Sequence, residues 1–286
     1  MLRTVKRLLI GAARAGLPAA CVLAAAAAPA VSGERPLPDP VGYGKRIFGD
    51  IKELPSKPGS WSKGQWLLAG SVVAATGGSL FVDDSVADYY DTHRQEYLRN
   101  ISMAVTHFGD SKYQVPVISG LWVTGYALGS MKLRKIAADA TEASMIAALM
   151  INPTINYLTG RALPSSGESP SRFKPFTWHR YSFPSGHTAA AFALASVLDV
   201  DLRDTFGYWH LPIVYGGAIA VANSRLYDRK HYLSEVILGG AIGWAVGTWV
   251  ASKDREAPVK AGAPAPKEPK VTLRPYHYGL LASMKF

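Results

Sequence analysis

Cysteine is almost missing from this sequence, since Cys21 is the only one in 286 residues. A single thiol excludes an internal disulfide framework and a thiolate-bound metal cluster. Charged residues are also sparse, at 18% of the chain, and no basic run is interleaved with aromatic residues. The sequence therefore gives no support for a nucleic-acid partner.

Clusters of carboxylates at metal-ligand spacing are lacking as well, so the sequence predicts neither a bound metal nor a cofactor. Acidic residues are outnumbered: 31 Lys and Arg against 21 Asp and Glu give a net charge of +10. Such a charge favours anionic lipid headgroups or phosphorylated substrates as partners. The hydrophobic share of 48%, with mean hydropathy +0.06, lies between a soluble enzyme and a protein made of membrane helices.

The first thirty residues have the pattern of an export signal. Basic residues precede a long Ala- and Leu-rich run, which ends in the small-residue sequence Ala28-Pro29-Ala30. We predict that residues 1–30 form a secretory signal peptide, with an uncleaved N-terminal anchor as the alternative. Residues 31–63 follow as a polar segment.

Six apolar stretches between residues 64 and 252 predict one all-α domain, a six-helix bundle embedded in a membrane. In the last stretch three glycines are spaced four apart, which places them on one helix face where another helix can approach closely. The stretches are Trp66–Val82, Val115–Ser130, Ile136–Leu158, Thr188–Val200, Leu211–Asn223 and Val236–Ala251, and the glycines are Gly239, Gly243 and Gly247.

Basic residues flank these helices in a way that predicts orientation. Those near Lys135, Arg203 and Lys253 share one side, which we assign to the cytoplasm. The loops 161–187 and 224–235 then meet on the opposite, extracytoplasmic side. A cleaved signal peptide conflicts with six crossings, so two alternatives stay open: Trp66–Val82 lies along the membrane, or the whole domain is soluble in the periplasm.

The C-terminal segment, residues 253–286, is expected to lie outside the helical domain. Its Ala-, Pro- and Lys-rich part up to Pro275 predicts an extended linker. The final residues alternate apolar side chains with period two, as β-strands do. We favour a short apolar tail docked on the domain, and keep an association with the outer membrane as an alternative location.

The most specific motif is Pro184-Ser185-Gly186-His187, which opens an apolar helix after a polar loop. A helix start offers free backbone N–H groups and the positive end of the helix dipole, and so forms a ready anion site. Glycine lets the backbone approach the anion, and the Ser185 hydroxyl can add a donor. A histidine at this place can give or take a proton beside a bound anion.

A second cluster joins Ser224 and Arg225 to His231 and Glu235. A separation of four residues places His231 and Glu235 on one helical face, so the carboxylate can hold one ring nitrogen and leave the other free as a nucleophile. Arg225 can bind two phosphate oxygens at once through its planar guanidinium.

Together the two clusters resemble the signature of the type 2 phosphatidic acid phosphatase superfamily, which runs from lipid phosphate phosphatases to vanadium haloperoxidases. The resemblance covers roughly residues 81–250. It implies that His231 attacks phosphorus to form a phosphohistidine, that His187 protonates the leaving oxygen, and that Glu235 orients His231. It also implies that Arg225 and the backbone at Ser185 and Gly186 bind the phosphate oxygens.

The chain departs from the family pattern in the first block. The family's two phosphate-binding cations are replaced by Asn156 and Leu163, although Gly160, Arg161 and Pro164 are kept. Glu235 also stands where the family has Asp. We predict Arg161 as a replacement phosphate ligand, with Arg172 and Lys174 as further candidates.

The sequence thus predicts a metal-independent acid phosphatase that acts on lipid phosphates or isoprenoid diphosphates in a bacterial inner membrane, with its active site facing the periplasm. A catalytically impaired family member that acts as a binding or scaffold protein is the first alternative. A vanadium-dependent haloperoxidase is the second, and the loss of two oxyanion-binding cations counts against it.

Overall fold

The computed structural model describes residues 40–177, 182–256, 270–276 and 279–285. The predicted signal peptide, residues 1–30, lies outside these ranges. The described domain is built of helices, which confirms the all-α prediction.

Each of the six apolar stretches forms a helix. The third is interrupted by a π-helical turn, η3 (Met145–Ile151), which separates α8 from α9. The six are α4 (Lys63–Ser79), α7 (Ser111–Ala127), α8 (Met131–Ser144) continued by α9 (Asn152–Thr159), α10 (Gly186–Phe206), α11 (Leu211–Tyr227) and α12 (Leu233–Glu256).

Further helices occur in segments that the sequence left without structure. They are less apolar, and so the hydrophobic stretches did not reveal them. They are α3 (Pro40–Glu53), α5 (Asp83–Thr92) and α6 (Glu96–Thr106), with the 3₁₀ turns η1 (Leu54–Ser60), η2 (His107–Gly109) and η4 (Pro164–Ser166).

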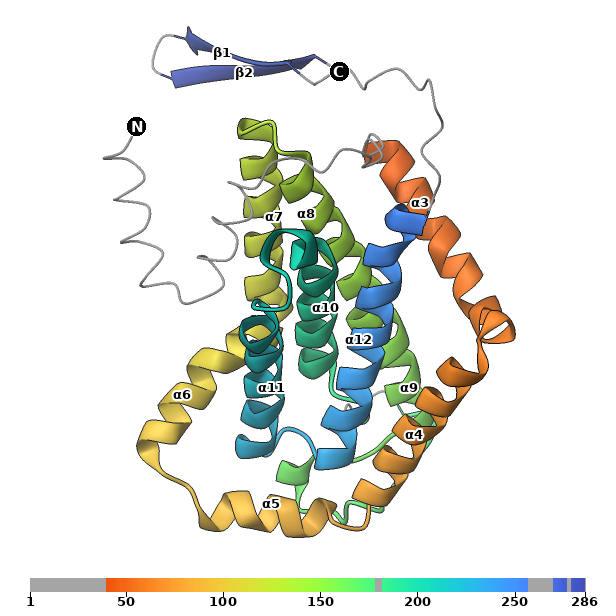
Figure 1. Ribbon diagram of the computed structural model, residues 1–286. Helices are drawn as coiled ribbons and strands as arrows, with labels where there is room; N and C mark the ends of the chain where they lie inside the picture. The colour runs from red at the N-terminus through yellow and green to blue at the C-terminus, as the bar shows by residue number, and fades with distance from the viewer. Residues whose placement is uncertain (1–39, 178–181, 257–269, 277–278, 286) are drawn as a thin grey trace.

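Helix α10 occupies the centre of the bundle and contacts α8, α11 and α12 (Figure 1). Its core-facing residue Val197 is fully buried with Leu133 and Ile146 from α8 and η3 and with Val250 from α12. Helices α4, α5 and α6 run around the outside, with α5 crossing below the ends of α11 and α12 in Figure 1.

The predicted glycine face of α12 packs directly on α10. A Cβ atom at Gly243 would lie 2.2 Å from the carbonyl oxygen of Ala189, and one at Gly239 would lie 2.5 Å from that of Ser185. Real side chains cannot come so close to a backbone, so these positions require glycine. The close approach of the two helices confirms the reading of the glycine spacing.

The basic residues that were expected to flank the helices do gather at one end of the bundle, but several are buried. The Lys135 ammonium lies 2.5 Å from Asp139 and 2.7 Å from Asp201, and Lys253 pairs with Asp50 of α3. These cations are therefore neutralised within the fold.

By length and hydropathy, one helix among the described residues could cross a membrane, over Leu233–Lys253 of α12. Half of its most apolar window is buried inside the protein. The pair Lys63–Ser79 and Asp83–Thr92 passes the same test only together, with a bend of 60° between the two helices.

The C-terminal segment differs from the extended linker that the composition predicted. Strand β1 (Lys270–Tyr276) pairs antiparallel with β2 (Gly279–Lys285), and Lys270 lies opposite Lys285. The linker prediction is wrong for residues 270–275, which form most of β1 and pair with the period-two segment at the end of the chain.

Candidate active site

The two predicted catalytic loops meet at one end of the bundle. The backbone N–H of Ser185 donates to the Glu235 carbonyl oxygen at 3.0 Å, which ties the start of α10 to the first turn of α12. The ends of α9 and α11 and the start of α5 lie at the same end (Figure 1).

His231 lies on the turn between α11 and α12 and is almost buried. Its Nδ1 atom is 2.9 Å from Oε2 of Glu235 and 2.8 Å from the carbonyl oxygen of Ser182. Both partners are acceptors, so the neutral ring carries its proton on Nδ1 and leaves the lone pair on Nε2. Nε2 is therefore the nucleophilic atom of this ring.

The Glu235 carboxylate is completely buried, and both of its oxygens have hydrogen-bond or ion-pair partners. The Ser182 hydroxyl lies 2.5 Å from each oxygen, and the backbone N–H of Tyr232 donates to Oε2 at 3.2 Å. The Arg161 guanidinium lies 3.1 Å from Oε1. The longer side chain, compared with the aspartate of the family, thus fits without losing the contact with His231.

His187 lies in the first turn of α10, with Nε2 4.0 Å from Asp110 of α7. Burial lowers the pKa of its imidazole to about 4. The charge of Arg225, and that of His231 when it is protonated, act in the same direction, whereas Asp110 opposes them.

Arg225 ends α11, where its Nη1 atom donates to the Thr106 hydroxyl at 2.6 Å. Its Nε atom is buried, and no acceptor among the described residues is bonded to it. An arginine with an unused buried donor beside two histidines is suited to bind an anion.

Ser185 is the N-cap of α10, and its hydroxyl accepts from the Thr188 hydroxyl at 2.9 Å. Its backbone N–H is already bonded to Glu235, which differs from our prediction of an anion-binding N–H at this residue. The N–H groups of Gly186 and His187 are the next donors at the helix start, because helices leave their first N–H groups without internal partners.

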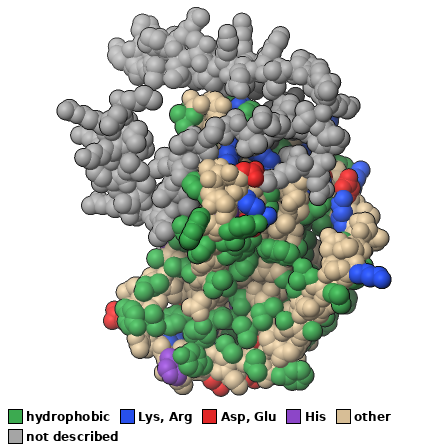
Figure 2. Space-filling model, in the orientation of Figure 1, with side chains coloured by type: hydrophobic (Ala, Val, Ile, Leu, Met, Phe, Trp, Pro, Cys, Tyr) green, Lys and Arg blue, Asp and Glu red, His purple; other side chains and the backbone are tan. Residues whose placement is uncertain are grey.

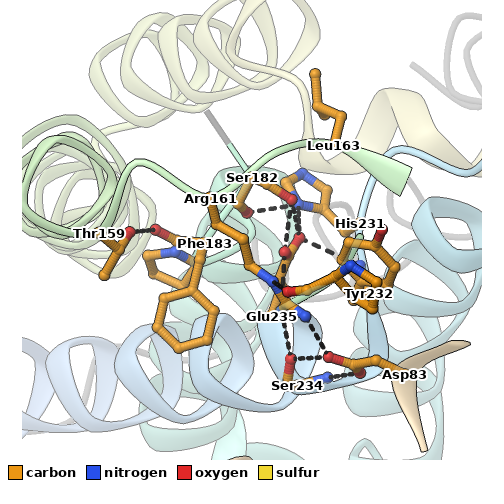
Figure 3. Close-up of polar contacts among 12 residues, drawn as sticks. Asp83, Thr159, Arg161, Leu163, Ser182, Phe183, His231, Tyr232, Ser234 and Glu235 are labelled. Carbon is orange, nitrogen blue, oxygen red and sulfur yellow. Dashed lines mark hydrogen bonds and ion pairs between the residues drawn. The ribbon is translucent and has the colours of Figure 1, made fainter. Parts of the chain in front are cut away.

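Arg161 lies elsewhere than predicted for a phosphate ligand. Its side chain has no exposed surface and all three guanidinium nitrogens have partners inside the protein: Nε donates to the Pro170 carbonyl, Nη1 to Ser234 and Nη2 to Asp83. Figure 3 shows it between Glu235 and Asp83. The alternative candidate Arg172 lies on the surface and pairs with Glu168.

Asn156 and Leu163, which replace the two cations of the first block of the family signature, have different surroundings. Asn156 is buried and donates to Asn152, whose side chain in turn donates to the carbonyl oxygen of Pro184. Leu163 lies apart from the polar cluster (Figure 3). Asn156 therefore supports the backbone of the Pro-Ser-Gly-His motif, whereas the apolar side chain of Leu163 offers no group that could bind an anion.

Several site residues were not found from the sequence. Asp83, Ser182 and Ser234 are fully buried beside Glu235, and Asp110 faces His187. Asp110 could have been recognised as the N-cap of α7, but no spacing in the sequence links the others to the histidines.

Known proteins resemble parts of this chain. Residues 142–257 match the PAP2 superfamily. A lipid A 1-phosphatase from Porphyromonas gingivalis is 32% identical over 90 residues, which are 32% of this chain and 20% of that protein. The match thus spans a fifth of the relative's length.

Two solved structures resemble this chain at low sequence identity. A transmembrane PAP2 type phosphatidylglycerolphosphate phosphatase from Bacillus subtilis has 20% identity and a TM-score of 0.45, with 67% of this chain and 94% of that chain covered. Aquifex aeolicus LpxE has 18% identity and a TM-score of 0.44, with 59% and 94% covered.

Proposed function

Residues 142–257 match the PAP2 superfamily, and from this match we propose that the chain hydrolyses phosphate esters of lipids. The observation that carries the proposal is the pair His231 and Glu235, whose 2.9 Å contact leaves Nε2 of the imidazole as nucleophile. The charge of Arg225, the proposed anion ligand, also lowers the pKa of His187, the proposed acid.

The reaction has two steps. In the first, Nε2 of His231 attacks phosphorus in line, a P–N bond forms, and the P–O bond to the lipid breaks while His187 gives a proton to the leaving oxygen. In the second, water attacks the phosphohistidine and gives a proton to His187, which releases inorganic phosphate and restores His231. Glu235 holds the Nδ1 proton and stabilises the charge that develops on the ring.

The phosphate oxygens are bound by Arg225 and by the backbone N–H groups of Gly186 and His187. Negative charge on the transferring group is stabilised both by the guanidinium and by the positive end of the α10 dipole. The family's two further cations are absent at Asn156 and Leu163, so we expect weaker anion binding than in a complete site.

A lipid substrate fits the surface of the domain. Large apolar side chains are exposed along α4, α6 and α7, among them Leu67, Val73 and Val123. Figure 2 shows hydrophobic side chains over much of the face below a zone with Lys, Arg, Asp and Glu. Such a surface supports placement in a bacterial inner membrane, and we assign the active site to the periplasmic side.

A second candidate function is a binding protein without activity on this fold. The observations that favour it are Asn156 and Leu163 in place of both first-block cations. It predicts retention of phosphorylated lipid without phosphate release, whereas the first proposal predicts turnover.

The test is phosphate release by the purified full chain from phosphatidic acid, phosphatidylglycerol phosphate, an isoprenoid diphosphate and an aryl phosphate, each with a chelator present. We expect release by the wild type and by His93→Ala, which changes an exposed histidine just after α5, and none by His231→Ala. Release that persists in His231→Ala would contradict the phosphohistidine route. Folded wild type that binds the lipid without releasing phosphate would support the second candidate.

A further inference from the structure

Arg161 forms an enclosed contact between two carboxylates. Its Nη2 lies 2.7 Å from Asp83 Oδ2 and its Nη1 lies 3.1 Å from Glu235 Oε1, and none of the three side chains has exposed surface. The guanidinium also stacks over the Tyr232 ring at 4.3 Å from its centroid. The residue is therefore fixed on every side and cannot reach a bound substrate.

The local backbone directs Arg161 into this place. Gly160 ends α9 in the left-handed conformation with φ 57°, and a Cβ atom there would lie 1.7 Å from the carbonyl oxygen of Lys174. Arg161 then forms an isolated β-bridge with Phe173, which turns its side chain toward the start of α12. A residue other than glycine at position 160 would displace the arginine.

The positive charge of Arg161 affects His231 indirectly, through the Glu235 carboxylate that contacts both residues. A buried carboxylate without a cationic partner is strongly destabilised in its ionised form and takes up a proton instead. The ionised form accepts on both oxygens, and together with the Ser182 carbonyl oxygen it keeps the imidazole proton on Nδ1. Arg161 is the cation that lies against Glu235, and it therefore maintains the acceptor that the nucleophile needs.

Asp83 extends the arrangement to another helix. It lies at the start of α5, and besides Arg161 it accepts from the Ser234 backbone N–H at 2.9 Å and from the Ser234 hydroxyl at 2.6 Å. Figure 3 shows the continuous row from Asp83 through Arg161 to Glu235 and His231. The contacts fix both ends of the guanidinium against the first turn of α12.

We propose that Arg161 and Asp83 are positioning residues that hold Glu235 ionised and in place, so that His231 keeps its Nε2 lone pair toward the substrate. The proposal rests on the proposed phosphatase function for its kinetic consequence. It also gives Arg161 a different role from the phosphate ligand that the sequence suggested.

The variants that test the proposal are Arg161→Lys and Asp83→Asn. Lysine keeps the positive charge but has a single ammonium, which cannot pair with both carboxylates in the same geometry. Asparagine keeps the size of Asp83 and removes its charge. Arg172→Lys is the matched control, because Arg172 is exposed and pairs with Glu168 at the surface.

The measured quantities are kcat and the inhibition constant of inorganic vanadate, a phosphate mimic that reports on the anion site. We expect kcat to fall roughly 10- to 100-fold in both variants, as for a misplaced catalytic group, with the vanadate constant within about threefold of wild type. A vanadate constant raised in Arg161→Lys as much as in Arg225→Lys would overturn the proposal, and so would unchanged kcat in both variants.

A spectroscopic measurement separates this proposal from the phosphatase proposal. Imidazole ¹⁵N chemical shifts show which ring nitrogen carries the proton, and the His231 signals are assigned by their loss in His231→Gln. We expect the Nδ1–H tautomer alone in wild type and a mixture in Arg161→Lys. If the wild type releases no phosphate, the proposed phosphatase function fails, and the tautomer measurement still tests the positioning role. An unchanged His231 tautomer in folded Arg161→Lys and Asp83→Asn would overturn that role.

Discussion

Oε2 of Glu235 lies 2.9 Å from Nδ1 of His231, four residues earlier in the chain, at a position where the family that the sequence resembles has aspartate. The extra methylene is accommodated because Ser182, Tyr232 and Arg161 hold the carboxylate from the other sides. The contact between the two residues therefore belongs to a set of partners that is adapted to the longer side chain.

Replacement of Glu235 by glutamine should lower kcat by roughly 10²- to 10⁴-fold, because the amide keeps the shape but cannot act as a doubly accepting anion. Glu235→Asp, which restores the residue of the family, should still lose about tenfold, since the shorter carboxylate moves away from its partners. Steady-state kinetics on the preferred lipid phosphate check both values. Activity of Glu235→Asp above wild type would show that the surroundings are not adapted to glutamate.

The imidazole of His187 should titrate far below the usual range for histidine in the empty site, with a pKa of about 4. Its folded pKa lies below the model-peptide value of 6.5, so the unfolded chain binds this proton more readily. The stability linked to His187 is thus fully present above pH 6.5 and is lost as the pH falls toward 4.

Thermal unfolding between pH 7 and pH 4 should therefore show a smaller loss of Tm in His187→Gln than in wild type. Bound vanadate should raise the pKa of His187, since an anion stabilises the imidazolium. An NMR titration of the ring with and without vanadate measures that shift, and a pKa near 6.5 in the empty site would contradict the expected environment.

Introduction of an arginine at Leu163 should strengthen anion binding. The family carries a cation at this position, and a hydrogen bond to a charged group contributes about 1.5–3 kcal/mol, which corresponds to roughly a 10- to 100-fold lower vanadate inhibition constant. Leu158→Arg, at an exposed position of α9, is the control and should leave the constant unchanged. An equal constant in Leu163→Arg and wild type would show that the new side chain does not reach the anion.

Addition of a methyl group at Gly243 should destabilise the bundle. Alanine has a helix propensity about 1 kcal/mol more favourable than glycine, but here its Cβ atom would lie 2.2 Å from a backbone oxygen of α10, and overpacking costs about 1–3 kcal/mol or more. At neighbouring Gly240 the Cβ atom would lie 3.4 Å from the Phe192 ring, which can move. We expect a lower Tm for Gly243→Ala and an equal or higher one for Gly240→Ala.

Apolar periodicity and motif order were sufficient to predict much of the architecture. The six hydrophobic stretches became helices, and the four-residue spacing of the α12 glycines predicted a close helix contact that the structure contains. Helices α3, α5 and α6 were missed because their sequences are more polar, and the hairpin was missed because proline and lysine in residues 270–276 obscured the strand.

The site could be predicted only as far as local spacing reaches. The contact between His231 and Glu235 was predicted from their four-residue spacing, although His231 lies on the turn before α12 and not on the helix itself. The start of α10 follows from its motif. Asp83 lies about 150 positions before Glu235, so no local spacing connects them. Arg161 was predicted as a phosphate ligand because it lies in the first block of the family signature, but its position in the sequence does not show where its side chain points. Side-chain direction was set by the turn at Gly160 and by the bridge to Phe173.

The close packing of α12 on α10 also affects the distance between the two histidines of the site. The proposed acid His187 lies in the first turn of α10, and the proposed nucleophile His231 precedes α12 by two residues. In the proposed reaction their separation therefore depends on how closely the two backbones approach at Gly239 and Gly243. Surface loops can lengthen or diverge without altering that separation. A single methyl group between the helices would widen it, and the same phosphorus atom could then no longer reach donor and nucleophile together.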